Sequence, residues 1–350
     1  MSEPARHLLF GTERYALPIL APLAAAIAAR GGRAAWCLPG VSAQLDAPAE
    51  RLRHWREVRA FAPDSVLCAA NVVPPFFPGA KVQLFHGFSV DKRSPERGHF
   101  RVRGLFDLYC TQGPDTTEAF RALAERHRHF RVAETGWPKL DPMFRPDPAA
   151  LAALRAGAAG RPVVAFGSTF TERLSAAPVL LSELARVVAS GRWYWLLTLH
   201  PKCAPELVQR YRALAGPHAR YVETEQLPAM LAAAEALVGD TSSIVSEFLC
   251  LERPVVTFRH RRPGPQHLEI ERPEQLEPAI AEALARPEPL MRAVRDYARR
   301  IHPSRDGRAS ERVLDAVAAF RAEGRNGLAR KPLDPLRRLQ LRWRYGGALA

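Results

Sequence analysis

The 350-residue sequence lacks the signature motifs of several common enzyme classes. It contains no G-x-x-x-x-G-K-[ST] loop, no G-x-G-x-x-G fingerprint, no H-E-x-x-H helix motif and no D-x-D pair. These absences argue against a P-loop kinase, a dinucleotide-dependent dehydrogenase, a metalloprotease and a transferase that holds its sugar nucleotide through a metal. We therefore expect neither a metal nor a cofactor.

Paired cysteines and long apolar runs are also absent. The five cysteines are scattered without a C-x-x-C pair, and three of them end apolar runs, which predicts reduced core residues of a cytoplasmic protein. The longest mildly apolar run, Tyr15 to Ala29, is shorter than the roughly 20 residues that span a bilayer. Glu3 and Glu13 lie where a secretory signal would be basic, so we expect no leader.

The composition is that of a globular protein with a strong positive charge. Hydrophobic residues make up 47% and charged residues 25%, and the length suits two domains of about 150 residues each. The net charge of +14 favours anionic partners, namely phosphate-rich substrates, anionic lipids or nucleic acid, without choosing among them. Residues 321–350 hold eight Arg or Lys and two acids, so much of the excess charge lies in the tail.

Short apolar runs alternate with amphipathic stretches in both halves of the chain. This rhythm predicts an α/β protein with two Rossmann-like, doubly wound parallel sheets. The Pro-rich segment 137–148 interrupts it, and this predicts domains over 1–147 and 148–305, with a C-terminal helix and basic tail over 306–350. The expected strands are 7–10, 34–38, 65–69, 82–85, 106–110 and 130–135 in the first domain, and 163–166, 193–199, 236–238 and 255–258 in the second.

The first candidate site follows a predicted strand of the first domain. Ligands of open parallel sheets bind beyond the carboxyl ends of the strands, and His86 and Gly87 come directly after the apolar run 82–85. An imidazole can accept a hydroxyl proton near neutral pH, and a glycine lets the backbone approach a ligand closely. A histidine that merely ends a strand is the alternative.

The second candidate repeats this arrangement in the other domain. His200 and Lys202 follow the run 193–199, and they can hold phosphate oxygens and neutralise charge on a leaving group. An ordinary turn is the alternative. On the functional reading, His86 and His200 face one cleft from opposite domains.

The third candidate is the most specific. The strand 236–238 is followed by Gly239 and Asp240, and then three hydroxyl residues open a helix. Free N–H groups at a helix start, together with hydroxyls, make an anion site. Simple N-capping needs only one Ser or Thr, so three in succession favour a phosphate or pyrophosphate ligand. The residues assigned to this site are Asp240, Thr241, Ser242 and Ser243.

Two further polar turns complete the set. One follows the first strand of the second domain and opens toward the same cleft, where an arginine can pair with phosphate oxygens or simply be solvated. The other lies at the interdomain crossing, where Gly and Pro can also set the turn alone. The residues concerned are Ser168, Thr169 and Arg173 in the first turn, and Gly136, Pro138, Lys139 and Asp141 in the second.

Taken in order, these segments resemble the CDP-glycerol glycerophosphotransferase family of teichoic-acid and capsule-type polymer synthesis, whose members have a GT-B architecture. The likeness runs over residues 83–258. His86 and Gly87 resemble the family's W-H-G-T-P segment, residues 135–141 its T-G-x-P-R-x-D stretch, and His200 the histidine of its R-x-H segment. Residues 239–258 resemble its D-Y-S-S helix followed by L-x-R-P, and this match is the longest.

The resemblance implies a transferase that uses a CDP-activated glycerol phosphate or ribitol phosphate. An acceptor hydroxyl attacks phosphorus and CMP leaves, with His86 as the base, His200 steadying the phosphates and residues 240–243 seating the donor. The first domain is then the acceptor side and the second the donor side. Phe88 and Ser89 replace the family's Thr-Pro, and Thr241 replaces its tyrosine, so a UDP- or GDP-sugar glycosyltransferase or an epimerase remains the alternative.

The C-terminal tail predicts a membrane contact. Within residues 333–345 the apolar side chains at 336, 339 and 343 fall on one helical face, and the arginines at 337, 338, 342 and 344 flank it. This pattern suits an anionic membrane surface, although a helix packed on the body or a disordered end is the alternative. The expected partners are a nucleotide-activated donor, a glycan or lipid-linked acceptor and the inner face of the cell membrane through residues 330–350.

A non-catalytic reading accounts for the charge alone. A basic protein that binds membranes or nucleic acid on an inactive fold would explain the net charge, but not two histidines and a hydroxyl triplet at strand ends. We therefore expect no specific nucleic-acid partner.

Overall fold

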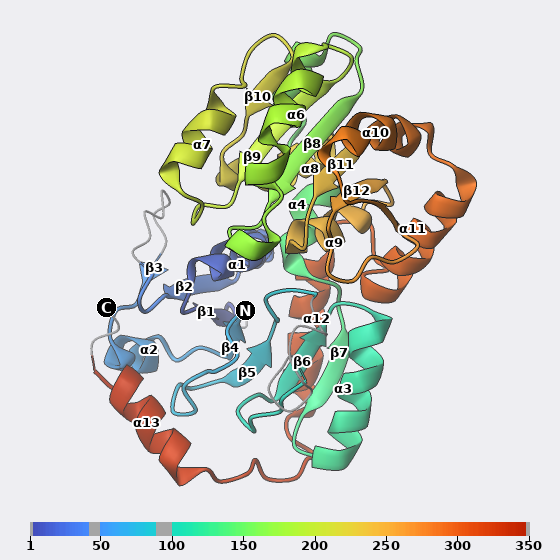
Figure 1. The fold of residues 1–350 in the computed structure, drawn as a ribbon. Helices are drawn as coiled ribbons and strands as arrows, with labels where there is room; N and C mark the ends of the chain where they lie inside the picture. The colour runs from blue at the N-terminus through green and yellow to red at the C-terminus, as the bar shows by residue number, and fades with distance from the viewer. Residues whose placement is uncertain (1–2, 42–49, 89–99, 348–350) are drawn as a thin grey trace. The chain divides into compact units, whose positions relative to one another are not determined.

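The computed structural model describes residues 3–41, 50–88 and 100–347 (Figure 1). The chain forms two compact units. Unit 1 comprises Met1–Asp141 and Asp306–Ala350, and unit 2 comprises Pro142–Arg305. Each unit is described by itself below. Residues 306–350, which the sequence pattern sets apart, are thus part of unit 1, and the chain leaves that unit after Asp141.

Unit 1 is built on a seven-stranded parallel sheet of order β3-β2-β1-β4-β5-β6-β7. Its inner strands are buried, as their short, nearly continuous apolar sequences require in a sheet covered on both faces. The strands are β1 (Arg6–Phe10), β2 (Arg33–Cys37), β3 (Glu50–Arg51), β4 (Ser65–Cys68), β5 (Ala80–Gln83), β6 (Leu108–Thr111) and β7 (Arg131–Glu134).

Helices from both ends of the sequence pack on this sheet. The late helix α12 contacts α1 as well as β5 and β6, so the chain returns to unit 1 after completing unit 2. The last helix, α13, contributes Leu341 and Tyr345 to the core of the unit. The helices are α1 (Leu17–Ala29), α2 (Trp55–Phe61), α3 (Pro114–His127), α12 (Ala309–Glu323) and α13 (Pro335–Tyr345).

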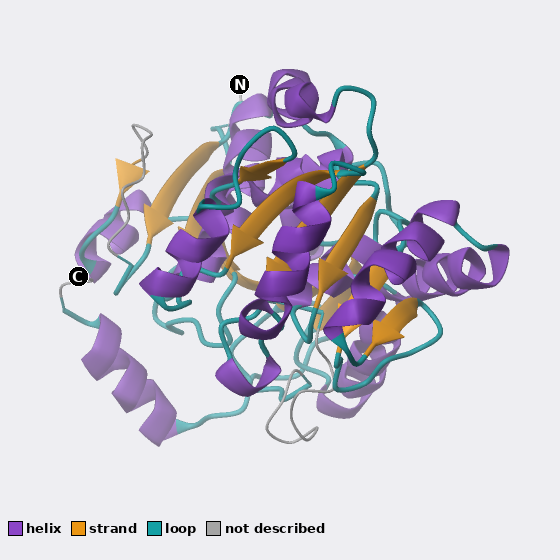
Figure 2. Ribbon diagram, turned by 45° about the horizontal axis from the view of Figure 1, so that its top comes forward, coloured by secondary structure: helices purple, strands orange, loops and turns teal. Residues whose placement is uncertain are grey.

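Unit 2 has a six-stranded parallel sheet of order β10-β9-β8-β11-β12-β13. Figure 2 shows helices (purple) in front of and behind the strands (orange). The strands are β8 (Val163–Ser168), β9 (Tyr194–Leu199), β10 (Ala219–Tyr221), β11 (Ala236–Gly239), β12 (Val255–Phe258) and β13 (His267–Ile270). The helices are α4 (Asp141–Phe144), α5 (Pro148–Arg155), α6 (Ala177–Ala189), α7 (Pro205–Arg212), α8 (Leu227–Ala233), α9 (Ser243–Leu249), α10 (Leu276–Ala285) and α11 (Glu288–Ile301).

Both sheets share one doubly wound topology. In each, the first three strands in sequence step toward one edge, and the fourth returns to pair with the first on its other side. The chain direction therefore reverses between β1 and β4 in unit 1 and between β8 and β11 in unit 2. The carboxyl ends of strands beside such a reversal are where open α/β sheets bind ligands.

Each of the ten expected strands overlaps a strand of the structure, although some bounds differ. The strand expected over 82–85 is β5, which ends at Gln83, so two residues separate it from His86. The edge strands β3, β10 and β13 were not predicted, because they are short and carry polar residues. All five cysteines are free and four are buried.

Candidate active site

A buried carboxylate organises the carboxyl edge of the unit 2 sheet. Asp240 directly follows β11 and is fully buried. Its Oδ2 accepts hydrogen bonds from Ser168 Oγ at 2.5 Å and from the Ala176 backbone N–H at 2.9 Å, and the Thr169 N–H lies 3.1 Å from both of its oxygens. These bonds tie the loop after β8 to the end of β11, across the point where the chain direction reverses.

This network gives Asp240 and Ser168 a positioning role. Burial raises the pKa of Asp240, and the bonds from Ser168, Ala176 and Thr169 oppose that rise. Ser168 Oγ is itself occupied, because it also accepts from the Ala177 N–H at 3.2 Å. Both side chains thus shape the edge of the sheet, and their polar atoms already have partners.

The three hydroxyl residues of the hydroxyl triplet beyond Asp240 differ in their contacts. The first is hydrogen-bonded to a neighbouring loop, and the other two are partly or fully exposed. Thr241 Oγ1 accepts a hydrogen bond from the Arg261 N–H at 3.0 Å. Ser242 is the N-cap residue of the seven-residue helix α9, yet among the described residues its side chain makes no capping hydrogen bond. Ser242 is half-buried and Ser243 is exposed. Ordinary N-capping therefore does not account for the Ser242 hydroxyl.

His200 and Lys202 form a small cluster beyond β9. The Lys202 N–H donates to His200 Nδ1 at 3.1 Å. The ring of Phe170, from the loop after β8, lies 4.4 Å from the His200 ring, and Lys202 Nζ stands 5.4 Å from the Phe170 ring. Burial, followed by the charge of Lys202, lowers the pKa of His200. The imidazole is therefore neutral near neutral pH, beside an exposed cation and an exposed aromatic ring.

Sequence reasoning missed two members of this edge. Phe170 lies inside a turn predicted only for its hydroxyls and arginine. The loop after β12, residues 259–262, reads Arg-His-Arg-Arg and is held against the hydroxyl triplet through the Arg261 bond to Thr241. The sequence could have indicated this loop, because its cations directly follow a predicted strand. Arg173 lies exposed in the short helix Glu172–Leu174.

In unit 1, an unusual backbone turn presents His86. Phe85 has a φ of 58°, in the left-handed region that non-glycine residues rarely occupy. The Phe85 side chain is buried against Tyr109 and Phe120, with ring centroids 6.1 and 5.0 Å away, and this packing fixes the turn. The exposed His86 ring stacks on Tyr15 at 5.0 Å.

Gly87 has open space where a side chain would be. A Cβ placed on Gly87 would meet no atom of the described residues within 4 Å. Its carbonyl oxygen accepts a hydrogen bond from Gln112 Nε2 at 3.2 Å, and Gln112 is buried. Ser89, a departure from the family pattern, lies outside the described residues.

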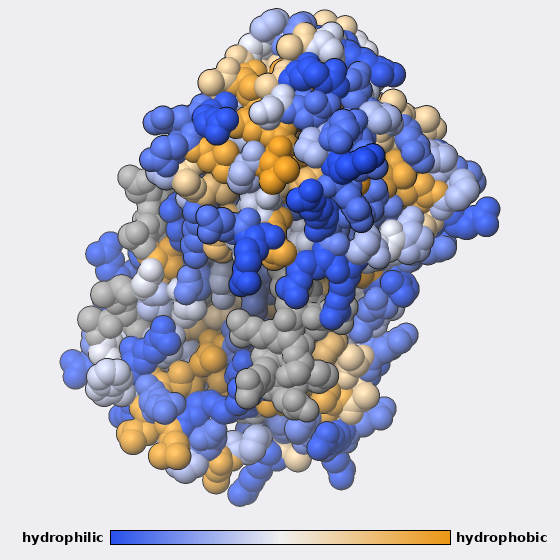
Figure 3. Space-filling model, in the orientation of Figure 1, coloured by the Kyte–Doolittle hydropathy of each residue, from blue (hydrophilic) through white to orange (hydrophobic). Residues whose placement is uncertain are grey.

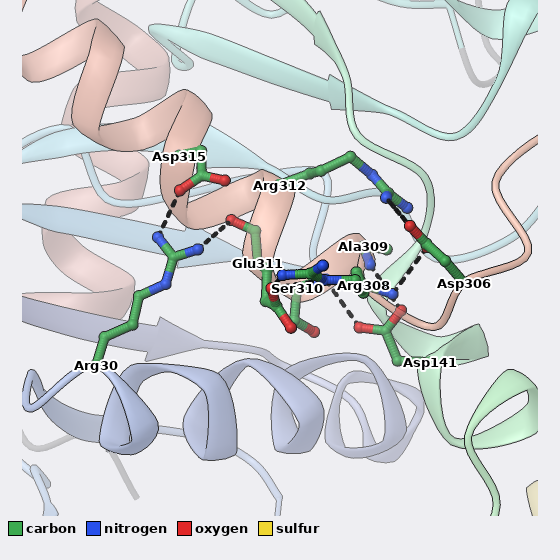
Figure 4. Close-up of polar contacts among 9 residues, drawn as sticks. All are labelled: Arg30, Asp141, Asp306, Arg308, Ala309, Ser310, Glu311, Arg312 and Asp315. Carbon is green, nitrogen blue, oxygen red and sulfur yellow. Dashed lines mark hydrogen bonds and ion pairs between the residues drawn. The ribbon is translucent and has the colours of Figure 1, made fainter.

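The segment 135–141 closes the N-terminal part of unit 1. Gly136 has a φ of 77°, which explains a glycine there. Pro138 begins a short helix, and Lys139 Nζ lies 5.2 Å from the Trp137 ring centroid. Asp141, the last residue before the chain leaves unit 1, accepts the backbone N–H groups of Ala309 and Ser310, each at 2.8 Å (Figure 4).

Asp141 thus caps the helix on which the chain returns. Figure 4 shows its carboxylate turned toward the start of α12, where Arg312 pairs with Asp306 at 2.8 Å. Arg312 also donates to the Thr135 carbonyl oxygen at 2.8 Å. The exit from unit 1 and the return to it are therefore joined by polar contacts within that unit.

The arrangement offers a candidate base in unit 1 and a candidate anion-binding edge in unit 2. Hydroxyls and cations suit phosphate groups. The described residues contain no group of three His, Cys, Asp or Glu placed to hold a metal. No helix in the described ranges is both long and apolar enough to span a membrane.

Several solved structures are similar to this chain in fold. The wall teichoic acid polymerase TagF matches with a TM-score of 0.65 and 15% identity, covering 92% of this chain and 90% of that one. A putative UDP-N-acetylglucosamine 2-epimerase from Listeria monocytogenes matches with a TM-score of 0.62, 16% identity and coverage of 95% and 99%. A complex of MnaA with UDP from S. aureus gives 0.61, 16%, and 94% and 99%. No curated protein sequence matches significantly.

These likenesses show a GT-B-like fold of two Rossmann-like parallel-sheet domains with C-terminal helices, as predicted. The sequence adds a second finding, because residues 88–262 match one family description. That stretch holds half of the chain and includes Asp240, the hydroxyl triplet and His200. The chain therefore belongs to the CDP-glycerol:poly(glycerophosphate) glycerophosphotransferase family.

Proposed function

We propose that this chain transfers a polyol phosphate, either glycerol phosphate or ribitol phosphate, from a CDP-activated donor to an acceptor hydroxyl in the synthesis of a cell-surface polymer. The family match over residues 88–262 carries this proposal. The matched stretch contains the whole polar edge of unit 2, from Ser168 to Arg261, and begins just after His86 and Gly87.

The proposed reaction is one displacement at phosphorus. The acceptor oxygen attacks the donor phosphorus that bears the polyol, so a new phosphodiester bond forms. The bond from this phosphorus to the bridging oxygen breaks, and CMP leaves with the electron pair. His86 takes the proton of the attacking hydroxyl, which is the role of a general base. This step requires the acceptor hydroxyl to reach both His86 and the donor phosphorus.

The donor pyrophosphate is assigned to the edge of unit 2. The Ser242 and Ser243 hydroxyls and the cation of Lys202 are proposed to bind phosphate oxygens, and neutral His200 donates a hydrogen bond to the leaving phosphate. Thr169 and Arg173 are assigned to the same ligand. Donors aimed at developing negative charge are a large source of rate enhancement. Ser168 and Asp240 contribute by fixing the loops that carry these groups.

The acceptor and location complete the proposal. We assign a glycan or lipid-linked hydroxyl compound as acceptor, because the family description names a polymer of glycerophosphate. We place the protein in the cytoplasm, at the inner face of the cell membrane, where such an acceptor is accessible.

Ligand-dependent thermal stability tests the donor assignment. A ligand that binds only the folded state raises the melting temperature by mass action. We expect CDP, CMP and CDP-glycerol to stabilise the protein in EDTA, and a Ser242→Ala/Ser243→Ala variant to lose most of this shift. Ser190→Ala is the matched control. Ser190 precedes β9, so it lies at the amino ends of the strands of the same sheet, away from the carboxyl ends where the donor is assigned.

The same measurement distinguishes the alternative. The fold likeness to a putative UDP-N-acetylglucosamine 2-epimerase favours a sugar nucleotide as the second candidate donor. Stabilisation by UDP or GDP in place of cytidine nucleotides would move the assignment to that class. Failure of both CDP-glycerol and CDP-ribitol to yield CMP when incubated with extracts containing acceptor would contradict the transfer itself.

A further inference from the structure

The C-terminal helix α13 has two apolar faces, and one of them is packed on unit 1. Leu341 and Tyr345 are 7% and 3% exposed and belong to the core of the unit. The Tyr345 ring meets Phe10 of β1 edge-on at 5.8 Å. The helix is therefore packed on unit 1, which was one of the alternatives that the sequence left open.

The opposite face of α13 exposes large apolar side chains. Leu336, Leu339 and Trp343 are 73%, 67% and 89% exposed, and Leu333 just before the helix is also exposed. At about 100° per residue, these three helical positions fall on the side away from Leu341. These four are among seven exposed large hydrophobic side chains in the described part of the chain, so the apolar exposure is concentrated here. Figure 3 shows orange and blue surface side by side over this region.

Positive charge surrounds this face. Residues 330–347 contain six basic side chains and a single acid, Asp334, which pairs with Arg337 at 3.2 Å. Arg342 and Arg344 flank the apolar positions on the two sides of the helix. An exposed apolar stripe between arginines is the pattern of a helix that lies in the interface of an anionic bilayer.

A basic hollow adjoins the start of the helix. The positively charged residues that line it are Arg103, Lys331, Arg337 and Arg338. Lys331 is paired with Asp107 at 2.7 Å and Arg337 with Asp334, so Arg103 and Arg338 supply the excess charge. This excess of positive charge suits an anionic phosphate group.

The hollow depends on a close contact between distant segments. Gly104 has a φ of 71°, and a Cβ there would lie 2.4 Å from Pro332. Glycine thus lets the segment before α13 lie against the loop that carries Arg103. The apolar stripe and the hollow are held together by the fold of unit 1.

We propose that α13 docks unit 1 on an anionic lipid surface, with Leu336, Leu339 and Trp343 inserted at the headgroup boundary and a lipid phosphate held by Arg103 and Arg338. Charge complementarity selects this occupant. A second copy would bring the same arginines against each other, which disfavours self-association through this face. Docking deepens the proposed function, since it places the enzyme where a lipid-linked acceptor lies, but it requires no donor.

Vesicle sedimentation of the full chain tests the proposal. We expect binding to phosphatidylcholine vesicles that contain phosphatidylglycerol, and little binding to phosphatidylcholine alone. Leu336→Ser/Leu339→Ser/Trp343→Ser should reduce binding by at least about tenfold. Arg103→Gln/Arg338→Gln should reduce it by about thirtyfold, because each of the two cations near an anionic surface contributes about 1 kcal/mol. Val179→Ser, which removes an exposed apolar side chain in unit 2, is the control.

Three outcomes would overturn the proposal. Parental binding by the triple variant would exclude the apolar face, and a dimer that the triple variant converts to a monomer would assign that face to a second copy. Binding of inorganic phosphate that the arginine variant loses while its vesicle binding is unchanged would make the hollow a soluble-anion site. The cytidine-nucleotide thermal shift, measured on the same variants, separates loss of docking from failure of the proposed function.

Discussion

The two units place a buried polar pair on equivalent strands but at opposite ends of the sheet. In unit 1, His7 of β1 and Ser65 of β4 are partners in register, with His7 Nδ1 2.8 Å from Ser65 Oγ, at the amino end of the strands. In unit 2, Ser168 ends β8 and Asp240 follows β11, at the carboxyl end. Only the second pair lies at the edge where ligands of such sheets bind.

This difference shows how one fold prepares two kinds of edge. Unit 2 uses a buried carboxylate to hold neighbouring loops, which leaves the hydroxyls of Ser242 and Ser243 outside that network. Unit 1 uses aromatic packing around Phe85 to set a single turn, which presents His86. A preorganised polar edge suits an anionic donor, and an exposed imidazole suits proton transfer. Four predictions test this contrast, in order of expected effect.

The largest effect is expected at His86. If this residue is the base, His86→Gln should lower the rate of CMP release from CDP-glycerol by about 10²–10⁴-fold, the range typical of general base catalysis. The nucleotide-dependent thermal shift should remain, because the donor edge lies in unit 2. Steady-state assays with radiolabelled CDP-glycerol measure the rate.

His127→Gln is the matched control, since His127 is an exposed histidine at the end of α3. It should leave activity unchanged. If His86→Gln keeps full activity, another group is the base, and the proposed difference in role between the two units is wrong.

The second effect concerns stability. Asp240→Ala removes the acceptor of a hydroxyl and two backbone N–H groups in a buried site, and each unsatisfied group costs about 1–3 kcal/mol. We expect a loss of about 3 kcal/mol in the free energy of unfolding, measured by urea denaturation. Asp240→Asn keeps one acceptor oxygen and should lose less. Equal stability of all three proteins would show that the network does not organise this edge.

Some of this contrast was accessible from the sequence. Apolar runs followed by His, Gly, Asp and hydroxyl residues located the strand ends, because parallel strands in a covered sheet are uniformly apolar and their ends are not. The family resemblance rested on the same segments. Edge strands such as β13 escaped prediction, since partly exposed strands carry mixed sequences.

Which hydroxyls are already bonded was not accessible. Ser168 and Ser242 occupy similar places in the sequence, each after a strand in a polar turn. The first is bonded to Asp240, 72 residues away, and the second has no capping bond among the described residues. The pairing register of β8 and β11 determines which of these two hydroxyls lies beside Asp240. Likewise, the sequence predicted that α13 either packs on the body or contacts a membrane. The structure shows two opposite apolar faces, so one can pack on unit 1 while the other remains exposed.

The third effect tests a carboxylate that unit 1 buries. Asp141 accepts two backbone N–H groups at the start of α12, so Asp141→Ala should cost about 1–2 kcal/mol, as loss of a helix cap does. Asp147→Ala is the control, because Asp147 caps α5 in the same way from an exposed position and should cost less. If the two variants lose equal stability, burial does not increase the stabilisation that Asp141 gives to α12 as a helix cap.

The smallest effect is a pH dependence that belongs to the pair in unit 1. Burial lowers the pKa of His7 to about 4, against an opposing contribution from Asp64 and a further lowering by Arg321. The unfolded chain then binds the proton first as the pH falls below about 6.5, so stability is lost from there down to about pH 4. At pH 5.5 the loss from this residue is about 1 kcal/mol relative to pH 7.5.

His7→Gln should remove this part of the acid-dependent loss, measured as the difference between urea midpoints at the two pH values. His267 of unit 2 has its pKa lowered in the same direction by burial, so the parent and the variant must be compared and the remaining slope belongs to other groups. The pair in unit 2 carries the opposite sign, because burial raises the pKa of Asp240 and acid does not weaken its contribution. A variant with the full slope of the parent would mean that the His7 ring is not held in its neutral form.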